Sequence, residues 1–310
     1  MRLSSSPLAQ PRHRAPCDLA PAPWVLQLLD GAARTRRIGR IDRTIASGSG
    51  ASLVTARIAD AGAMDAARFE QGTMDAYQCI RDALPALPHA HPVRFWNYLP
   101  GIHEPSDAGR DRYMVFNAGR FKALSDWFGG PDHLPERLPA ASGVGHDGDE
   151  LVVHCLAFDQ PGEAIENPRQ IPAFRYSARY GLRPPCFARA TVVADPRGGA
   201  PMLLVAGTAS IRGEESIHQG DLSGQLDETL ENLRTLIGVA DGSPTGATLA
   251  AYTDLRVYHL RDADAAAIES SVRQAFGPQV HLQMARADLC RADLLVEIEG
   301  VARLAPRRTH

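Results

Sequence analysis

Apolar side chains recur at helical intervals in two separate stretches of the chain. An apolar residue at every third or fourth position lines one face of a helix, which then packs on a sheet or on another helix. The pattern predicts helices over about residues 112–128 and 224–236, carried by Tyr113, Phe116, Phe121, Leu124 and Phe128 in the first and by Leu226, Leu230, Leu233 and Ile237 in the second.

The order of predicted elements repeats in the two halves, at a separation of about 150 residues. The first half has a helix, a strand and a helix at residues 72–84, 93–99 and 112–128. The second half has the same order at residues 224–236, 254–260 and 264–276. Each half is therefore predicted to form one β-α-β-α-β unit. The alternative is a chance likeness between two amphipathic helix–strand pairs.

Further apolar runs, rich in Val, Leu and Ile, predict strands at residues 151–158, 187–194, 202–206, 256–260 and 294–301. Strands that alternate with helices in this way favour an α+β fold of two similar sheet-and-helix units packed side by side. We expect a partly irregular N-terminal arm, an N-terminal unit and a C-terminal domain, at residues 1–40, 41–150 and 151–310.

Composition excludes several classes of protein. The 310 residues carry a formal net charge of −3, and no Lys/Arg run alternates with aromatic residues, so we expect no nucleic-acid partner. No run approaches the roughly 20 apolar residues of a membrane span, and the first residues lack an apolar segment of signal type. We therefore expect no membrane association and a cytoplasmic location.

Cysteine and histidine spacing gives no sign of a disulfide framework or a metal centre. The five cysteines are scattered and form no CxxC pair, so we expect free thiols. His89 and His91 form an HxH pair in a Pro-rich loop without further ligands, and we predict no metal site. Residues 47–50 lack the Gly-Lys-Ser/Thr ending of a phosphate loop and are predicted to form a turn.

The predicted strand at residues 294–301 contains two acidic side chains. A period of two places Glu297 and Glu299 on one face, and Val296 and Ile298 on the other. A carboxyl group that is partly buried in such a strand has a raised pKa, which suits a proton donor near neutral pH. Glu297 is therefore a candidate general acid, with Cys290 just before the strand. The alternative is a half-exposed edge strand whose glutamates face water.

Binding residues are predicted in a segment rich in Arg, Tyr and Pro, at residues 167–190. Guanidinium and phenol groups hold carboxylates, so this segment suits a small dicarboxylate, whereas the alternative is an exposed basic connector. Arg120 lies on an apolar helical stripe, from which its head either enters a cleft or extends to water. Gly207 ends a predicted strand, where it either leaves room for a substrate ring or forms a strand-end bulge.

These residues together resemble a known family. The C-terminal half is similar to the RidA/YjgF family of imine-handling proteins, a fold also described as chorismate-mutase-like, through residues 206–210, 232–233, 257–258 and 296–299. From about Trp24 onward, the chain looks like a chorismatase built on that fold. The added resemblance lies in the Tyr-rich stretch from Tyr176 to Ala190 and in Leu289, Cys290 and Arg291.

The resemblance implies cleavage of the enolpyruvyl ether of chorismate without a cofactor, which releases pyruvate and 3-hydroxybenzoate, with 4-hydroxybenzoate as a second product in one branch. It implies that Glu297 protonates the enolpyruvyl methylene. Gly207 and Cys290 match the branches that form aromatic products, and Cys290 counts with Glu297 as a catalytic position. The resemblance assigns substrate binding to Arg120, Tyr176, Tyr180, Arg189 and Gly207.

Two other functions fit part of the same pattern. A RidA-like enamine or imine deaminase would need only the C-terminal half. A non-catalytic small-molecule-binding protein would keep the arginines without needing Glu297. The two-unit chain favours a monomer, because the second unit replaces part of a trimer interface, and a small homo-oligomer is the alternative. The sequence departs from the chorismatase pattern at Ser177, where that family often has proline.

Overall fold

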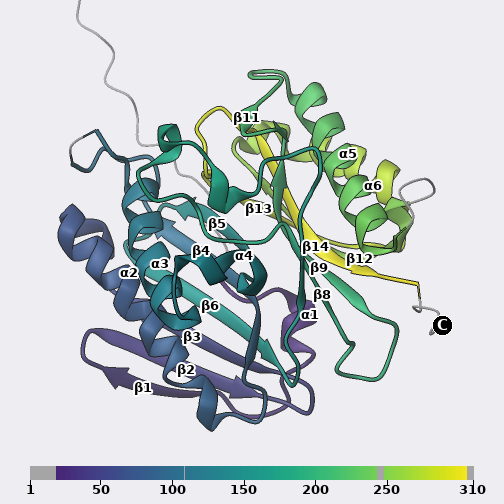
Figure 1. The fold of residues 1–310 in the computed structure, drawn as a ribbon. Coiled ribbons are helices and arrows are strands. Elements are labelled where there is room, and N and C mark those ends of the chain that lie inside the picture. Colours follow the sequence, from purple (N-terminus) through teal and green to yellow (C-terminus); the bar gives the residue numbers. More distant parts are fainter. Residues whose placement is uncertain (1–18, 108, 243–247, 306–310) are drawn as a thin grey trace, which may run out of the picture.

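Two six-stranded sheets form the centre of the molecule, and a computed structural model describes residues 19–107, 109–242 and 248–305 (Figure 1). The first sheet has the order β1 (Arg34–Ile38), β2 (Ile41–Ser47), β3 (Ser52–Ile58), β6 (Leu151–Phe158), β4 (His91–Pro100) and β5 (Ala140–His146). The second has the order β13 (His281–Arg286), β12 (Tyr252–His259), β14 (Val296–Arg303), β9 (Met202–Ala209), β8 (Ala190–Val193) and β7 (Glu163–Ile165).

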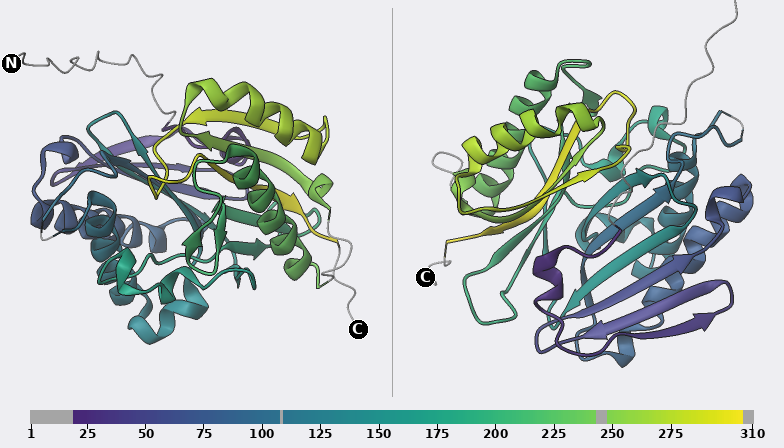
Figure 2. Two further views of the ribbon diagram at one scale, coloured as in Figure 1. Left: turned by 90° about the horizontal axis from the view of Figure 1, so that it is seen from above. Right: turned by 180° about the vertical axis from the view of Figure 1, so that it is seen from behind.

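Long helices cover the outer face of each sheet, and the inner faces pack against each other (Figure 2). The first sheet carries α2 (Ala66–Arg81) and α3 (Arg112–Phe128), and the second carries α5 (Leu222–Ala240) and α6 (Ala265–Phe276). Shorter elements are α1 (Pro23–Leu26), α4 (Leu134–Arg137) and the hairpin of β10 (Ile211–Arg212) and β11 (Glu215–Ser216). The α+β class and the two sheet-and-helix units packed side by side are confirmed.

The core between the sheets is built from side chains of both units. Trp96 and Leu156 of the first sheet belong to the same buried cluster as Leu204, Tyr258 and Val301 of the second. Burial of large apolar side chains on both inner faces is the main force that holds the units together. A cavity between the sheets is therefore lined by residues that are far apart in the sequence.

The helix at residues 112–128 has the predicted bounds because its two ends carry clear signals. Asp111 accepts a hydrogen bond from the Met114 N–H (2.8 Å) as the N-cap, and Gly129 ends the helix with a φ of 85°. The helix predicted at residues 72–84 instead runs from Ala66 to Arg81, because Asp65 caps it earlier in the chain. The turn predicted at residues 47–50 joins β2 and β3.

The acidic strand is internal to its sheet, so the edge-strand alternative is wrong. β14 pairs antiparallel with β12 on one side and with β9 on the other. The predicted alternation holds, because Val296 and Ile298 belong to the helix-side core while Val301 belongs to the core between the sheets. The strand starts two residues later than predicted, since the Leu295 N–H donates to Gln225 Oε1 (2.8 Å) rather than to a strand partner.

The boundary between the units lies beyond the expected division at residues 150 and 151. β6 lies between β3 and β4 and pairs with both, so Leu151–Phe158 is part of the first sheet. The expected arm at residues 1–40 includes residues 1–18, which lie outside the described part, as does Cys17. The rest of that arm contains α1 and β1, and β1 is a strand of the first sheet.

We expect Leu233→Ala to destabilise the protein by about 2–5 kcal/mol, because it removes a wholly buried side chain from the α5–sheet core. The free energy of unfolding from urea titration measures this loss. Leu182→Ala is the matched control, since Leu182 is 84% exposed and should change stability little. Equal stability of the two variants would contradict the packing described for α5.

Candidate active site

A cavity of about 520 Å³ lies between the two units and contains Glu297. Its walls come from the start of α3, the Arg/Tyr/Pro-rich segment, β9 and the loop that precedes β14. Of the predicted site residues, the ones that line it are Tyr176, Tyr180, Arg189, Gly207, Cys290 and Glu297. The structure thus brings together side chains that span more than one hundred positions of sequence, as a site for one small ligand requires.

Glu297 is a buried carboxyl group at the cavity wall, only 3% exposed. Burial raises its pKa to about 8, and the nearby negative charge of Glu299 acts in the same direction. Arg94 and Arg189 oppose this rise. At pH 7 the group is mainly neutral and carries a proton that it can donate.

Cys290 lies beside this acid as a neutral thiol. Its Sγ is 4.0 Å from Glu297 Oε2, and burial raises its pKa to about 12, with the Glu297 carboxyl as the next cause. A thiol with so high a pKa is a poor nucleophile. Cys290 therefore shapes the wall around Glu297 rather than attacking a ligand.

Gly207 provides the space that the Glu297 carboxyl occupies. A Cβ atom at this position would lie 2.0 Å from Glu297 Oε1, and the pairing of β9 with β14 shifts register between Ile298 and Gly300. The Gly207 N–H donates a hydrogen bond to Ser142 Oγ (2.9 Å). Gly207 lies inside β9 at this irregularity and lacks the positive φ expected of a strand-end bulge. The room beside it is taken by the side chain of Glu297, and a role toward a substrate ring stays a prediction.

Arg189 is a buried cation that faces the cavity. Its Nη2 donates to Tyr176 Oη (2.6 Å) and to the Ile171 carbonyl oxygen (3.0 Å), and its guanidinium carbon lies 5.2 Å from the centroid of the Phe187 ring. Its Nε is buried without a hydrogen-bond partner. A buried donor left unpaired is costly, so the site favours an anionic ligand that supplies an acceptor.

Arg291 is a second cavity cation, and the sequence did not single it out as a binding residue. Its guanidinium carbon lies 4.0 Å from the centroid of the Tyr180 ring and 5.3 Å from that of Tyr176. Its Nη1 donates to the Glu214 carbonyl oxygen (2.7 Å) and to Tyr180 Oη (3.1 Å). The only sequence signal was its position next to Cys290. Arg189 and Arg291, both on aromatic rings, form the cationic wall together with the more exposed Arg179, which lies over Tyr180 and pairs with Glu215.

Arg120 does not line the cavity, in contrast to its predicted binding role. It is 1% exposed, donates from Nη2 to Asn117 Oδ1 (2.8 Å) and lies over the rings of Phe116 and Phe187. The alternative in which its head extends to water is also wrong, because the whole side chain is buried. The Phe187 ring contacts two guanidinium groups: its centroid lies 5.8 Å from the guanidinium carbon of Arg120 and 5.2 Å from that of Arg189.

Several further side chains border the cavity without a predicted role, among them the acidic Asp111, Glu215 and Asp293. Arg179 is exposed and pairs with Glu215, and it donates to Tyr180 Oη. Tyr113, Met114 and His103 line the cavity although their sequence context gave no functional signal. Tyr113 belongs to the apolar stripe of α3, which periodicity alone assigns to the core.

No group of three or more His, Cys, Asp or Glu side chains within the described ranges is arranged to hold a metal ion. Cys79, Cys155, Cys186 and Cys290 are free thiols. No helix in the described part of the chain is long and apolar enough to cross a membrane.

Comparisons with known proteins agree on one family. Residues 30–157 match the model of the N-terminal domain of FkbO/Hyg5-like chorismatases. A 3-hydroxybenzoate synthase from Streptomyces hygroscopicus is 37% identical over 244 residues, which cover 76% of this chain and 70% of the relative. A chorismatase from Streptomyces rapamycinicus is 35% identical over the same shares of each chain. This chain belongs to the chorismatase family.

A solved structure supports the same assignment for the fold of most of the chain. The crystal structure of a chorismatase shares 29% sequence identity with it and superposes with a TM-score of 0.74. The match covers 87% of this chain and 79% of the other. The two-unit arrangement is therefore that of a chorismatase, and the predicted resemblance is confirmed.

We expect Cys290 to react slowly with iodoacetamide at pH 7, because its raised pKa leaves little thiolate. Mass spectrometry of the peptide that carries Cys290 gives the rate, with glutathione as the reference thiol. The rate should still be rising at pH 9. A rate at pH 7 equal to that of glutathione would contradict the neutral-thiol assignment.

Proposed function

We propose that this protein cleaves the enolpyruvyl ether of chorismate to pyruvate and a hydroxybenzoate. The single observation that carries the proposal is a buried carboxyl group with a pKa of about 8, Glu297, in a cavity that also presents Arg189 and Arg291. Relatives that are 35% and 37% identical to this chain over the aligned residues are named chorismatase and 3-hydroxybenzoate synthase. The proposed main product is 3-hydroxybenzoate, with 4-hydroxybenzoate as a second product.

The proposed chemistry starts with proton transfer to carbon. Protonation of an enol ether at its methylene requires an acid that is still protonated near pH 7, which a buried carboxyl provides. In the proposal Glu297 gives its proton to the methylene, and the ether carbon becomes an oxocarbenium-like centre. The bond between the ring carbon and the ether oxygen then breaks as the neighbouring ring hydroxyl loses its proton and its oxygen attacks that ring carbon, so pyruvate leaves with the ether oxygen and an arene oxide remains. The oxide then opens at the carbon that first carried the hydroxyl, its oxygen takes up a proton, and the carbon that keeps the oxygen loses its hydrogen.

The proposed reaction is balanced without a co-reactant. The ring loses a proton as it becomes aromatic, and this proton replaces the one that Glu297 gave. Chorismate contains all the atoms of pyruvic acid and hydroxybenzoic acid together, so no oxidant or cofactor is needed. Arg189 and Arg291 are proposed to hold the two carboxylates of the substrate, with Tyr176 and Tyr180 holding the guanidinium groups in place.

Incubation of the purified protein with chorismate tests the proposal. Release of equal amounts of pyruvate and aromatic acid, measured enzymatically and by chromatography, is the expected result. Binding of chorismate without turnover would instead favour a binding protein. Turnover of an imine without turnover of chorismate would favour the deaminase, which the family relationship over 76% of the chain does not support.

We expect Glu297→Gln to lower kcat at least about a hundredfold while chorismate still binds, because an amide has the same shape but no proton to give. In the wild type, kcat/KM should be constant below the Glu297 pKa of about 8 and fall as pH rises above it, because only the protonated form is active. Steady-state kinetics from pH 6 to pH 10 measures both. Normal turnover by the variant would remove Glu297 from the mechanism.

Gly207→Ala should lower turnover and change the ratio of aromatic products, because its Cβ would overlap the Glu297 carboxyl and push it into the cavity. Chromatography of the products gives both readings. Gly72→Ala in α2 is a control for the loss of a glycine, since a Cβ there would make only ordinary contacts, 3.5 Å from Ile58 Cδ1 and 3.8 Å from Met64 Sδ. An unchanged product ratio in Gly207→Ala would reject the close contact between Gly207 and Glu297.

A further inference from the structure

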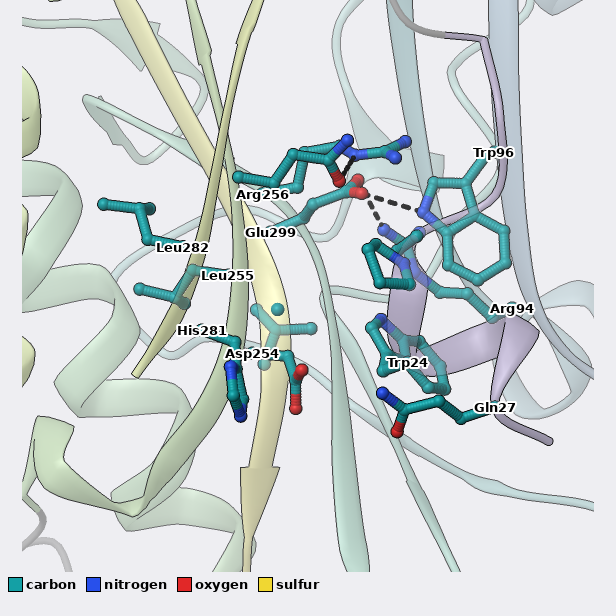
Figure 3. A pocket seen from close by; sticks show the side chains of 15 residues that line it. Trp24, Gln27, Arg94, Trp96, Asp254, Leu255, Arg256, His281, Leu282 and Glu299 are labelled. Atoms are coloured by element: carbon teal, nitrogen blue, oxygen red, sulfur yellow. Dashed lines mark hydrogen bonds and ion pairs between the residues drawn. The ribbon is translucent and has the colours of Figure 1, made fainter. Parts of the chain in front are cut away.

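Glu299 lies two residues after Glu297 on the same face of β14, yet it opens onto a different cavity. This second cavity, of about 260 Å³, is lined by residues of α1, of β4 in the first sheet and of β12, β13 and β14 in the second (Figure 3). Glu297 lines the larger cavity and does not line this one. The two carboxyl groups of one strand face are therefore placed in separate environments.

Donors from the facing sheet surround the Glu299 carboxylate. Arg94 Nη2 donates to its Oε2 (2.9 Å), and Trp96 Nε1 donates to its Oε1 (2.8 Å), as the dashed lines in Figure 3 show. Ser142 Oγ also donates to Oε2, and Tyr258 Oη lies 3.4 Å from Oε1. Glu299 and Arg94 are only 3% and 2% exposed. The group is fixed in position, and its charge is paired.

Ser142 connects this cluster to the floor of the larger cavity. Its Oγ accepts the Gly207 N–H (2.9 Å) while it donates to Glu299. Gly207 in turn lies directly against the Glu297 carboxyl, since a Cβ atom added to this glycine would lie 2.0 Å from Glu297 Oε1. A continuous path of contacts thus runs from Glu299 through Ser142 and Gly207 to Glu297.

We propose that Glu299 is a positioning residue that acts through Glu297, by fixing the Gly207 backbone with Ser142 and by placing the carboxylate of its ion pair with Arg94 beside the acid. The inference rests on the proposed function of Glu297 as the proton donor. It deepens that function, because it explains how one of two neighbouring glutamates donates a proton while the other stays paired.

The charge of Glu299 acts together with the other groups that face Glu297. These titratable or charged groups are Glu299 of β14, Cys290 of the preceding loop, Tyr258 of β12, which is paired with Glu297 across the strands, Arg94 of β4, Arg189 before β8 and Tyr113 of α3. Burial has the largest effect on the Glu297 pKa, and the charge of Glu299 is the next. Neutralising Glu299 removes a charge that raises the Glu297 pKa, and it leaves the Arg94 charge, which lowers that pKa, without its counterion. Both effects lower the Glu297 pKa.

The test is the Glu299→Gln variant, and its main readout is the pH dependence of kcat/KM rather than the activity at one pH. We expect the pH at which kcat/KM falls to half its plateau to move down by at least about one unit. Infrared spectroscopy should show the same shift in the C=O band of protonated Glu297, identified as the band missing in Glu297→Gln. An unchanged infrared midpoint in folded Glu299→Gln would overturn the inference.

Glu228→Gln is the matched control. Glu228, on α5, is also a buried glutamate and is 5% exposed. It pairs with Arg169 and Arg212 and lines neither cavity. It should lower stability as Glu299→Gln does but leave the pH midpoint of the wild type unchanged. An equal midpoint shift in both variants would show that general destabilisation, and not the charge of Glu299, is responsible.

Two further variants separate charge from position. Ser142→Ala keeps the Glu299–Arg94 pair but removes the acceptor of the Gly207 N–H, so kcat should fall with little shift in the midpoint. Arg94→Gln combined with Glu299→Gln removes both charges, so its midpoint should lie between those of Glu299→Gln and the wild type. If Glu299→Gln does not fold, a wild-type midpoint in this double variant, with normal kcat in Ser142→Ala, overturns the inference.

The infrared titration also keeps this inference distinct from the proposed function. Absence of chorismate turnover by the wild type would reject the function, whereas the infrared midpoints of the wild type and Glu299→Gln would still report how Glu299 affects Glu297. Turnover of chorismate with equal infrared midpoints would leave the function in place and reject the role of Glu299.

Discussion

The buried carboxylate of Glu299 and its donors Arg94, Trp96 and Ser142 form the interaction on which the geometry of the site depends. Removing a charged pair from water costs free energy, and this cost is offset only when its oxygens find good donors. Here the acceptor comes from the second sheet and the donors from the first. The cluster therefore fixes how the inner faces meet, and the cavity is formed by that meeting.

Two carboxyl groups on one strand face thus acquire opposite character. Glu299 is surrounded by donors, while Glu297 lies against Gly207 and the neutral thiol of Cys290. Burial without strong donors raises the pKa of Glu297 to about 8, and the nearby negative charge adds to the rise. The strand period of two makes the groups neighbours, and the facing sheet makes them different.

The cationic side of the cavity is built on aromatic rings. Arg291 lies over Tyr180, and Arg189 lies over Phe187 and donates to Tyr176. Rings hold a guanidinium in place without neutralising it, as a carboxylate partner would. This leaves the positive charge of both arginines available to an anionic ligand.

Periodicity and end signals along the chain determined the helices, the α+β class and the shared face of Glu297 and Glu299, because these depend on neighbours within a few positions. The two-unit organisation followed from the repeat of the same elements about 150 residues apart. The resemblance to chorismatases also came from local motifs. The tertiary structure alone placed Arg120 outside the cavity, added Arg291 to it and assigned β6 to the first sheet. It also decided which glutamate is neutral, because the charge state of a buried carboxyl depends on donors such as Arg94, which lies about two hundred positions away.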